Sequence, residues 1–194
     1  MTRTSTITRE TRETTVSVSV DLDGRGETAI ATGIGMLDHL LGSFAHHAMI
    51  DLTVTTVGDL HVDDHHTVED TFLVVGSAID EALGDRAGIR RFGNAAVPMD
   101  EALARCAIDF GGRPWSVVEA SFRTERLGAL STQMIPHGLD ALARTSGATI
   151  HLSATGRNDH HVAESMFKAL AIATRSAVEI DPRRSGIPST KGTM

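Results

Sequence analysis

The chain has 194 residues, with 18 Lys and Arg against 25 Asp and Glu, which gives a formal net charge of -7. That length suits one domain or two small fused halves, and the negative charge argues against general nucleic-acid binding. The single cysteine, Cys106, excludes an internal disulfide and a thiolate-rich metal site, and no apolar run has the length of a secretion signal or a membrane span. The sequence therefore predicts a cytoplasmic protein that binds neither nucleic acid nor membranes.

The first half of the chain mixes strand and helix patterns. Residues 14–24, TTVSVSVDLDG, alternate small polar residues with Val and Leu, which predicts a half-buried strand that enters a hairpin with 27–33 as its partner. Apolar residues at helical spacing predict a helix over 36–48. Alternation returns over 50–63, and the pattern of 67–84 predicts a second helix that ends at its glycine.

Much the same order starts again after a loop over 84–100. Residues 101–120 predict a strand, a Gly-Gly-Arg-Pro turn and another strand. A helix containing 137–145, a strand over 148–156 and a helix over 162–179 follow. The repeated order indicates an internal duplication.

An unusual motif occurs once in each half. DDHHTVED (63–70) and NDHHVAES (158–165) both carry His-His-x-x-Glu behind an Asp, and both continue into an apolar helical segment with a Phe at the same offset. A further histidine, His39 or His137, precedes each pair at a similar distance. Chance similarity of two amphipathic helices is the alternative to duplication, but it does not account for these shared polar residues.

Histidine and glutamate at this spacing can bind metal ions. Residues three or four apart share a helix face, whereas adjacent histidines point about 100° apart, so each repeat should serve two different ions. Three imidazoles and one carboxylate per ion, without thiolate, suit Mn, Fe, Co, Ni or Zn and leave room for substrate on an octahedral ion. His46, His61 and His151 are interpreted as packed or surface residues. The eight candidate ligands are His39, His65, His66, Glu69, His137, His160, His161 and Glu164.

Three segments rich in glycine or proline, GIRRFG, GGRP and IPSTKG, carry cations and hydroxyls. Such turns free backbone N–H groups that can converge with charged side chains on a phosphate, although each segment alone is equally typical of a solvated loop. The C-terminal SGIPSTKGTM has too little apolar content for a core, so we expect it to fold over a bound ligand. The candidate anion-binding residues are Arg90, Arg91, Arg113, Ser189, Thr190 and Lys191.

Taken in order, these motifs resemble the imidazoleglycerol-phosphate dehydratases of histidine biosynthesis. The resemblance runs along nearly the whole chain, through ETTVSVSVDLDG, GIGMLDHLL, GDLHVDDHHTVED, GIRRFG, VPMDEAL, GGRP, NDHHVAESMFKALA and IPSTKG. It implies an α/β fold of the α+β type, with two duplicated halves that are each a four-stranded sheet with helices on one face. We expect one domain over 1–194, with repeats at about 10–90 and 100–182 and a substrate-binding tail at 183–194.

The resemblance also implies a reaction, a hydro-lyase that dehydrates D-erythro-imidazole glycerol phosphate to imidazole acetol phosphate. It implies two Mn²⁺ per active site, or other first-row divalent metals, bound by the eight candidate ligands. It further implies a homo-oligomer, expected to have 24 subunits, with active sites between subunits. Its substrate contacts fall on Glu13, His47, Arg91, Arg113, Ser189 and Lys191.

Glu13 is the candidate acid/base, because it is a carboxylate among these substrate contacts and is not a metal ligand. From the sequence alone, an exposed charge in a polar N-terminal arm is the simpler interpretation of this residue. Glu69 and Glu164 are weaker candidates, since a metal-bound carboxylate is a poorer base. Asp100 and Glu101, in VPMDEAL, have no assigned role.

The chain departs from the family pattern at a few positions. Met36 stands where an aromatic residue is usual, Gly111 where Ser is usual, and Gly138-Leu139 where an aromatic pair is common. These departures concern packing and loop geometry.

Two other functions remain open at this point. A metallohydrolase acting on a phosphate ester would prefer carboxylate bridges to this excess of histidine. A metal-storage or metal-sensing oligomer would leave the arginines and the PSTKG tail without a purpose. A nicotinamide enzyme is not indicated, because no GxGxxG follows a strand.

Overall fold

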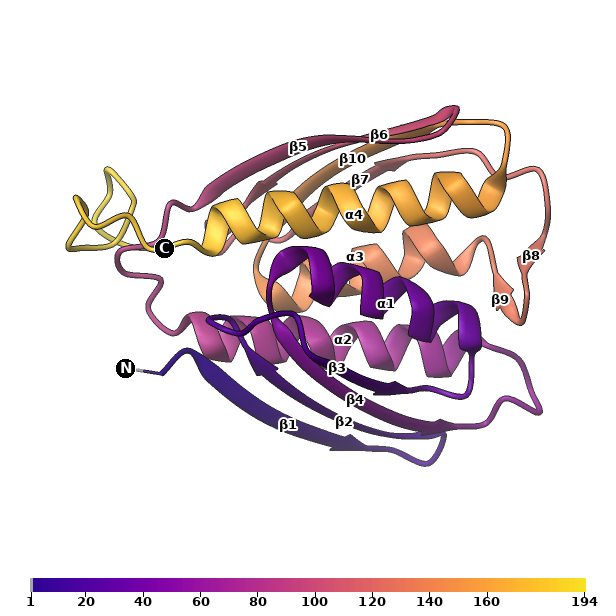
Figure 1. Cartoon of the computed structure of the whole chain (residues 1–194). Coiled ribbons are helices and arrows are strands. Elements are labelled where there is room, and N and C mark those ends of the chain that lie inside the picture. The colour runs from indigo at the N-terminus through magenta and orange to yellow at the C-terminus, as the bar shows by residue number, and fades with distance from the viewer. Residues whose placement is uncertain (1) are drawn as a thin grey trace.

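The computed structural model describes residues 2–194 and contains two four-stranded sheets with four helices between them (Figure 1). The first half consists of β1 (Thr4–Glu10), β2 (Thr14–Asp21), β3 (Thr28–Ala31), α1 (Gly35–Ala48), β4 (Asp51–Gly58) and α2 (His65–Leu83). The second half consists of β5 (Phe92–Met99), β6 (Ala102–Asp109), β7 (Trp115–Glu119), β8 (Arg126–Leu127), β9 (Leu130–Ser131), α3 (Met134–Ser146), β10 (Thr149–Thr155) and α4 (Asp159–Val178).

The topology of the two halves is the same. The strand order is β1-β2-β4-β3 in one sheet and β5-β6-β10-β7 in the other, so each runs first, second, fourth, third along its half. The last two strands in each order pair in parallel, and the other pairs are antiparallel. The predicted fold of two duplicated halves, each a four-stranded sheet with helices on one face, is confirmed.

The helices of the two halves pack face to face. α2 contacts α3, and α1 contacts α4, so each helix of one half meets a helix of the other. The two sheets form the outer layers, and their inward residues, such as Val16, Val18 and Ile150, are fully buried against these helices (Figure 1). Every helix begins at the end of the molecule where β8 and β9 lie. Side chains in the first turns of all four helices are therefore brought to one end.

Two predictions about strands were wrong, one on the pairing of β3 and one on the loop before β6. β3 does not form a hairpin with β2, because β4 lies between them and β3 pairs in parallel with β4. Residues 92–99, expected to be loop, form the edge strand β5. The inward position Gly93 carries no side chain because a Cβ there would lie 1.9 Å from the carbonyl oxygen of Ala173. The close approach of α4 thus removes the apolar alternation that would mark this strand.

The repeated phenylalanines form part of the shared core. Phe72 and Phe167 lie on α2 and α4, are almost fully buried, and have ring centroids 6.1 Å apart. Gly138 packs against the Phe72 ring, to which an added Cβ would come within 2.3 Å. The glycine that replaces an aromatic residue of the family pattern therefore fits a site that Phe72 already fills. No helix within residues 2–194 combines the length and hydropathy needed to cross a membrane.

Candidate active site

The first candidate metal cluster joins the two halves through α2 and α3. His65 and Glu69 lie one turn apart at the start of α2, and His137 lies in the first turn of α3, which packs against it. Nε2 of His65 is 3.7 Å from Oε2 of Glu69, and Nε2 of His137 is 3.5 Å from Oε1 of the same carboxylate. One possible ligand atom from each residue lies within 4.8 Å of the others.

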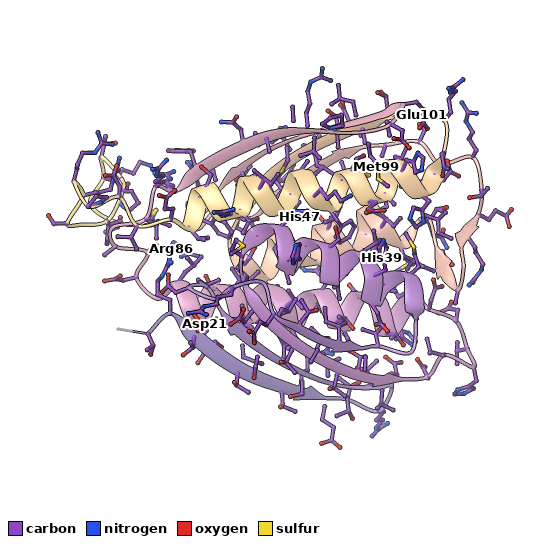
Figure 2. All side chains as sticks on the ribbon, in the orientation of Figure 1. Asp21, His39, His47, Arg86, Met99 and Glu101 are labelled. Atoms are coloured by element: carbon purple, nitrogen blue, oxygen red, sulfur yellow. The ribbon has the colours of Figure 1, made fainter. Side chains whose placement is uncertain are left out.

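The second cluster has the same composition on the other helix pair. His160 and Glu164 lie at the start of α4, and His39 comes from α1. Oε2 of Glu164 is 3.1 Å from Nε2 of His160 and 3.5 Å from Nε2 of His39. Figure 2 shows His39 at the end of α1 nearer to Glu101, with His47 further along the helix.

Both clusters fit a divalent metal ion. Metal bonds of about 2.0–2.2 Å place the ligand atoms around one ion about 3–3.5 Å apart, close to the distances between these nitrogens and oxygens. Nε2 of His137 is buried and, within residues 2–194, has no hydrogen-bond partner. A buried nitrogen without a partner is costly in a protein interior, so a bound cation would satisfy it. The donor set of imidazole and carboxylate suits first-row metals.

Cations hold both cluster carboxylates. Lys168 donates to Oε1 of Glu164 at 2.7 Å, on the oxygen that faces away from the two histidines. Burial acts to raise the pKa of Glu164, but the hydrogen bond and charge of Lys168, with His39, bring it below its usual value. Arg144 donates to Glu69 at 3.1 Å. Sequence reasoning missed both cations, although Lys168 follows Glu164 by one helical turn, a spacing at which side chains interact.

The remaining two candidate ligands, His66 and His161, lie outside both clusters. The rings of His65 and His66 are nearly perpendicular, at 87°. Neighbours on a helix point about 100° apart, so the two rings face different surroundings. Nδ1 of His66 lies 3.0 Å from Asp59, and Nδ1 of His161 lies 2.9 Å from Glu101. The structure thus brings together six of the eight residues in one chain and turns the other two elsewhere.

Each pairing shifts the pKa of one partner. The hydrogen bond with Asp59 is the main cause that raises the pKa of His66. The hydrogen bond from His161, followed by the backbone N–H groups of Asn158 and Arg157, lowers the pKa of Glu101 to about 2. Glu101 therefore contacts a candidate ligand, whereas Asp100 is exposed and lies 3.8 Å from His161.

The aspartate before each His-His pair anchors the segment around β8 and β9. Asp64 is buried and accepts a hydrogen bond of 2.8 Å from the Ser131 hydroxyl. Asp159 is buried and accepts from the backbone N–H groups of Arg123 and Thr124 at 2.8 and 2.7 Å. The shared Asp of the motif thus connects both ligand helices to one segment of the second half.

Glu13 lies in the turn between β1 and β2, at the same end of the molecule. Its Oε2 is 3.8 Å from Nε2 of His66, and its side chain is 55% exposed. Thr11 accepts hydrogen bonds from the backbone N–H groups of Glu13 and Thr14, and Thr14 donates to the buried Asp70 next to Glu69. The turn that carries Glu13 is therefore fixed to the ligand helix α2 and is not a free arm.

The predicted anion-binding segments converge in one pocket. It measures about 330 Å³. Arg91, at a backbone φ of 74°, makes a two-point hydrogen bond to Asp109 and donates to the carbonyl of Pro188 at 2.9 Å, which holds the tail against β6. Arg90 is not part of the pocket and pairs with Glu179. The predicted residues that line it are Arg91, Arg113, Ser189, Thr190 and Lys191.

The anion pocket and the metal clusters lie at opposite ends of the chain's long axis. The backbone N–H of Arg91 donates to the carbonyl of Ala177 at the end of α4, whereas His160 is at its beginning. At 1.5 Å per helical residue, positions 160 and 177 are about 25 Å apart. His47 lies on the last turn of α1, and burial, with the charges of His46 and Lys168, lowers its pKa. The structure thus places His47 and the anion residues away from the clusters of the same chain.

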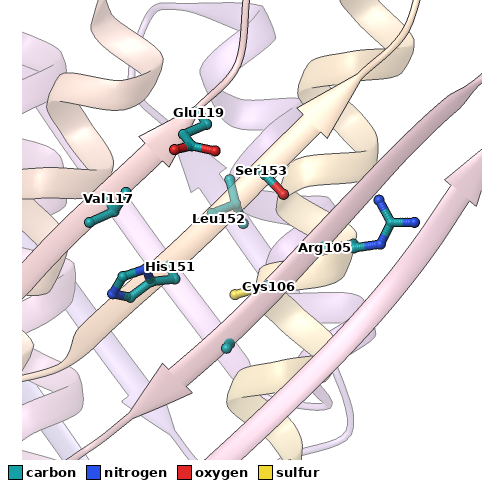
Figure 3. Close-up of a pocket in the computed structure, with 8 residues that line it drawn as sticks. Arg105, Cys106, Val117, Glu119, His151, Leu152 and Ser153 are labelled. Atoms are coloured by element: carbon teal, nitrogen blue, oxygen red, sulfur yellow. The ribbon is translucent and has the colours of Figure 1, made fainter.

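A further pocket lies on the outer face of the second sheet (Figure 3). It measures about 280 Å³ and is lined by β6, β7 and β10, with His151 and Glu119 among its residues. Cys106, which also lines the pocket, is buried, and burial raises the pKa of its thiol to about 12. The pocket contains none of the predicted site residues.

Comparison with known proteins places this geometry in a family. The family model described as Imidazoleglycerol-phosphate dehydratase matches residues 32–174, which include both clusters. The chain belongs to the imidazoleglycerol-phosphate dehydratase family. The resemblance stated from the sequence is confirmed, as is the expectation of an enzyme of the hydro-lyase class.

Relatives match along nearly their whole length. The imidazoleglycerol-phosphate dehydratase of Methylorubrum extorquens is 50% identical over 99% of this chain and 100% of its own. That of Phenylobacterium zucineum is 52% identical over 100% of both chains.

Two solved structures of the family have the same fold. The enzyme from Staphylococcus aureus subsp. aureus N315 matches with a TM-score of 0.83 at 31% identity, over 92% of this chain and 99% of its own. That from Pyrococcus furiosus, solved in complex with (S)-C348, also has a TM-score of 0.83, at 32% identity, over 97% and 100%.

Proposed function

We propose that this chain dehydrates D-erythro-imidazole glycerol phosphate to imidazole acetol phosphate in cytoplasmic histidine biosynthesis. The observation that carries the proposal is the convergence of six imidazole and carboxylate side chains in two matching clusters, with Glu13 at the same end, in a member of this family. A substrate with an imidazole ring and a phosphate suits the two kinds of site present, because metal ions bind ring nitrogens and the arginine pocket suits an anion.

Two Mn²⁺, or other first-row divalent ions, are proposed per active site. The clusters would each supply two histidines and one glutamate to an ion, and His66 and His161 would supply a third histidine. Metal ions bound there would hold the imidazole ring and stabilise negative charge that develops on it.

The chain is proposed to act as an oligomer in which subunits share each active site. The cluster of His160 and the anion pocket lie at opposite ends of α4, whose positions 160 and 177 are about 25 Å apart. The ring and the phosphate of the substrate are joined by a three-carbon chain, which is far too short to bridge that separation. A second copy must therefore bring its anion pocket to the metal clusters, which agrees with the 24-subunit assembly that we propose.

We propose one domain over 1–194 with two repeats and a substrate-binding tail at 183–194. The repeats, expected at about 10–90 and 100–182, also include the edge strands β1 and β5. The carbonyl of Pro188 accepts from Arg91, and Ser189, Thr190 and Lys191 line the anion pocket. Folding of this tail over the phosphate would exclude water from that end of the substrate.

The reaction needs a base for a carbon-bound proton and an acid for a leaving hydroxide. A proton is removed from the middle carbon of the side chain, hydroxide leaves the carbon bonded to the imidazole ring, and the enol that results becomes the ketone on the middle carbon. Glu13 is proposed to transfer these protons, since its carboxylate is exposed, free of the clusters and 3.8 Å from His66. The identity of the product tests the proposal directly: a ketone supports it, inorganic phosphate indicates a hydrolase, and tight metal binding without turnover indicates storage.

Arg113→Ala is expected to raise KM for the substrate about tenfold or more while kcat changes little. The side chain of Arg113 is 73% exposed and its nearest charge, Asp109, is 3.8 Å away, so its loss removes an anion contact without breaking a buried pair. Steady-state kinetics measure the effect. The matched control is Arg175→Ala, which removes a charge from the last turn of α4, and an unchanged KM in Arg113→Ala would exclude this residue from phosphate binding.

A further inference from the structure

His66 and His161, which lie outside the clusters, share one feature. In each, a carboxylate oxygen is within hydrogen-bond distance of the same ring nitrogen, Nδ1. We propose that Asp59 and Glu101 are positioning residues that fix His66 and His161 in the tautomer whose Nε2 can bind a metal ion. The inference rests on the proposed function, because it assigns these two carboxylates to the supply of the third histidine ligand. Neither residue is itself a candidate ligand.

The contacts are equivalent in the two halves. Nδ1 of His66 lies 3.0 Å from Oδ2 of Asp59, and Nδ1 of His161 lies 2.9 Å from Oε2 of Glu101. An ionised carboxylate can only accept a hydrogen bond, so each Nδ1 must carry the proton. A neutral imidazole has one N–H, and the lone pair is then on Nε2, the atom available to a metal.

Duplication alone does not explain these pairs. Asp59 directly follows β4, seven residues before His66, whereas Glu101 lies in the turn between β5 and β6 and is 60 residues away from His161. The repeat-equivalent histidines therefore obtain the same contact from different segments. The recurrence indicates a chemical requirement at the histidine, which is the role that outer carboxylates commonly have around metal-binding histidines.

The two carboxylates differ in how their oxygens are used. Oε1 of Glu101 accepts from the backbone N–H groups of Arg157 and Asn158 at 2.9 and 2.7 Å, and Oε2 faces His161. Asp59 directs both oxygens to one nitrogen, at 3.0 and 3.3 Å. Near-isosteric amides should therefore behave differently at the two positions.

Glu101→Gln is expected to reverse the tautomer of His161. A glutamine has one acceptor oxygen, which the two backbone N–H groups retain, so its NH₂ group faces Nδ1 and donates to it. His161 must then carry its proton on Nε2, where it blocks metal binding. Asp59→Asn can instead rotate its carbonyl oxygen toward Nδ1 of His66 and keep the original tautomer, whereas Asp59→Ala removes the acceptor.

The experiment is a titration of the metal-free full-length variants with Mn²⁺, with free Mn²⁺ followed by electron paramagnetic resonance. Wild type should bind two ions per chain, because each chain has eight candidate ligands and each ion takes four. Glu101→Gln and Asp59→Ala should each weaken one of the two sites by about 10- to 100-fold, and Asp59→Asn should stay close to wild type. Thermal unfolding of the metal-free proteins checks that each variant is folded.

The outcomes separate this inference from the proposed function. Two tight sites in folded Glu101→Gln, or equal losses in Asp59→Asn and Asp59→Ala, would overturn the positioning role while wild-type metal binding stands. If Glu101→Gln fails to fold, the comparison of the two Asp59 variants decides the matter. Failure of wild type itself to bind two ions would instead refute the proposed metal function.

Discussion

Glu13→Gln is expected to lower kcat about 10²- to 10⁴-fold, the range that a positioned acid or base contributes, while Mn²⁺ affinity stays unchanged. The carboxylate of Glu13 is at the metal end of the molecule, 3.8 Å from Nε2 of His66, and belongs to neither cluster. Glutamine keeps its size and its place in a turn held by Thr11, but cannot accept a proton.

Glu10→Gln is the matched control for this substitution. Glu10 is an exposed carboxylate at the end of β1, three residues before Glu13. Single-turnover kinetics with saturating substrate separate loss of chemistry from loss of binding. Near-normal kcat in Glu13→Gln would remove this residue from the mechanism.

His137→Leu is expected to abolish turnover and to weaken Mn²⁺ binding at its cluster more than about 100-fold, since outer-shell changes alone reach that range. The metal-free protein should be as stable as wild type or more stable. Leucine replaces a ring whose buried Nε2 has no hydrogen-bond partner among the described residues 2–194, and removal of such an atom lowers the cost of folding. Mn²⁺ should then raise the unfolding temperature of wild type more than that of the variant.

The matched control is His151→Leu, the same change on an exposed residue of β10 outside the clusters. Calorimetry with and without Mn²⁺ measures both proteins. Equal stabilisation by Mn²⁺ in His137→Leu and wild type would show that His137 is not a ligand.

The sequence predicted the helices and inner strands well, because their apolar periodicity reflects real burial. Strands β2 and β4 alternate buried and more exposed residues, as TTVSVSVD and DLTVTTVG suggest. The edge strands β1 and β5 were missed because their inward positions include Ser5 and Gly93, which carry no apolar signal. The parallel pairing of β3 with β4 could not be predicted without the position of α1, the helix that connects the two strands.

The site was predicted in kind but not in arrangement. The ligand types and their helix spacing are local, so HHxxE could be interpreted without a structure. Which histidine meets which glutamate depends on α1 packing against α4 and α2 against α3, so each cluster takes His39 or His137 from the other half. Arg144, which holds Glu69, lies outside the motifs. Asp59 and Lys168 lie within GDLHVDDHHTVED and NDHHVAESMFKALA, but their roles depend on contacts that only the folded chain makes.

The most direct test of metal-dependent dehydration is turnover of imidazole glycerol phosphate by metal-stripped protein, with and without added Mn²⁺. The ketone product is followed, and folding of the stripped protein is checked by circular dichroism. We expect no ketone without metal and full recovery on addition of Mn²⁺. Absence of ketone with any first-row metal, in folded and metal-loaded protein, would contradict the proposed function, as would equal turnover with and without metal.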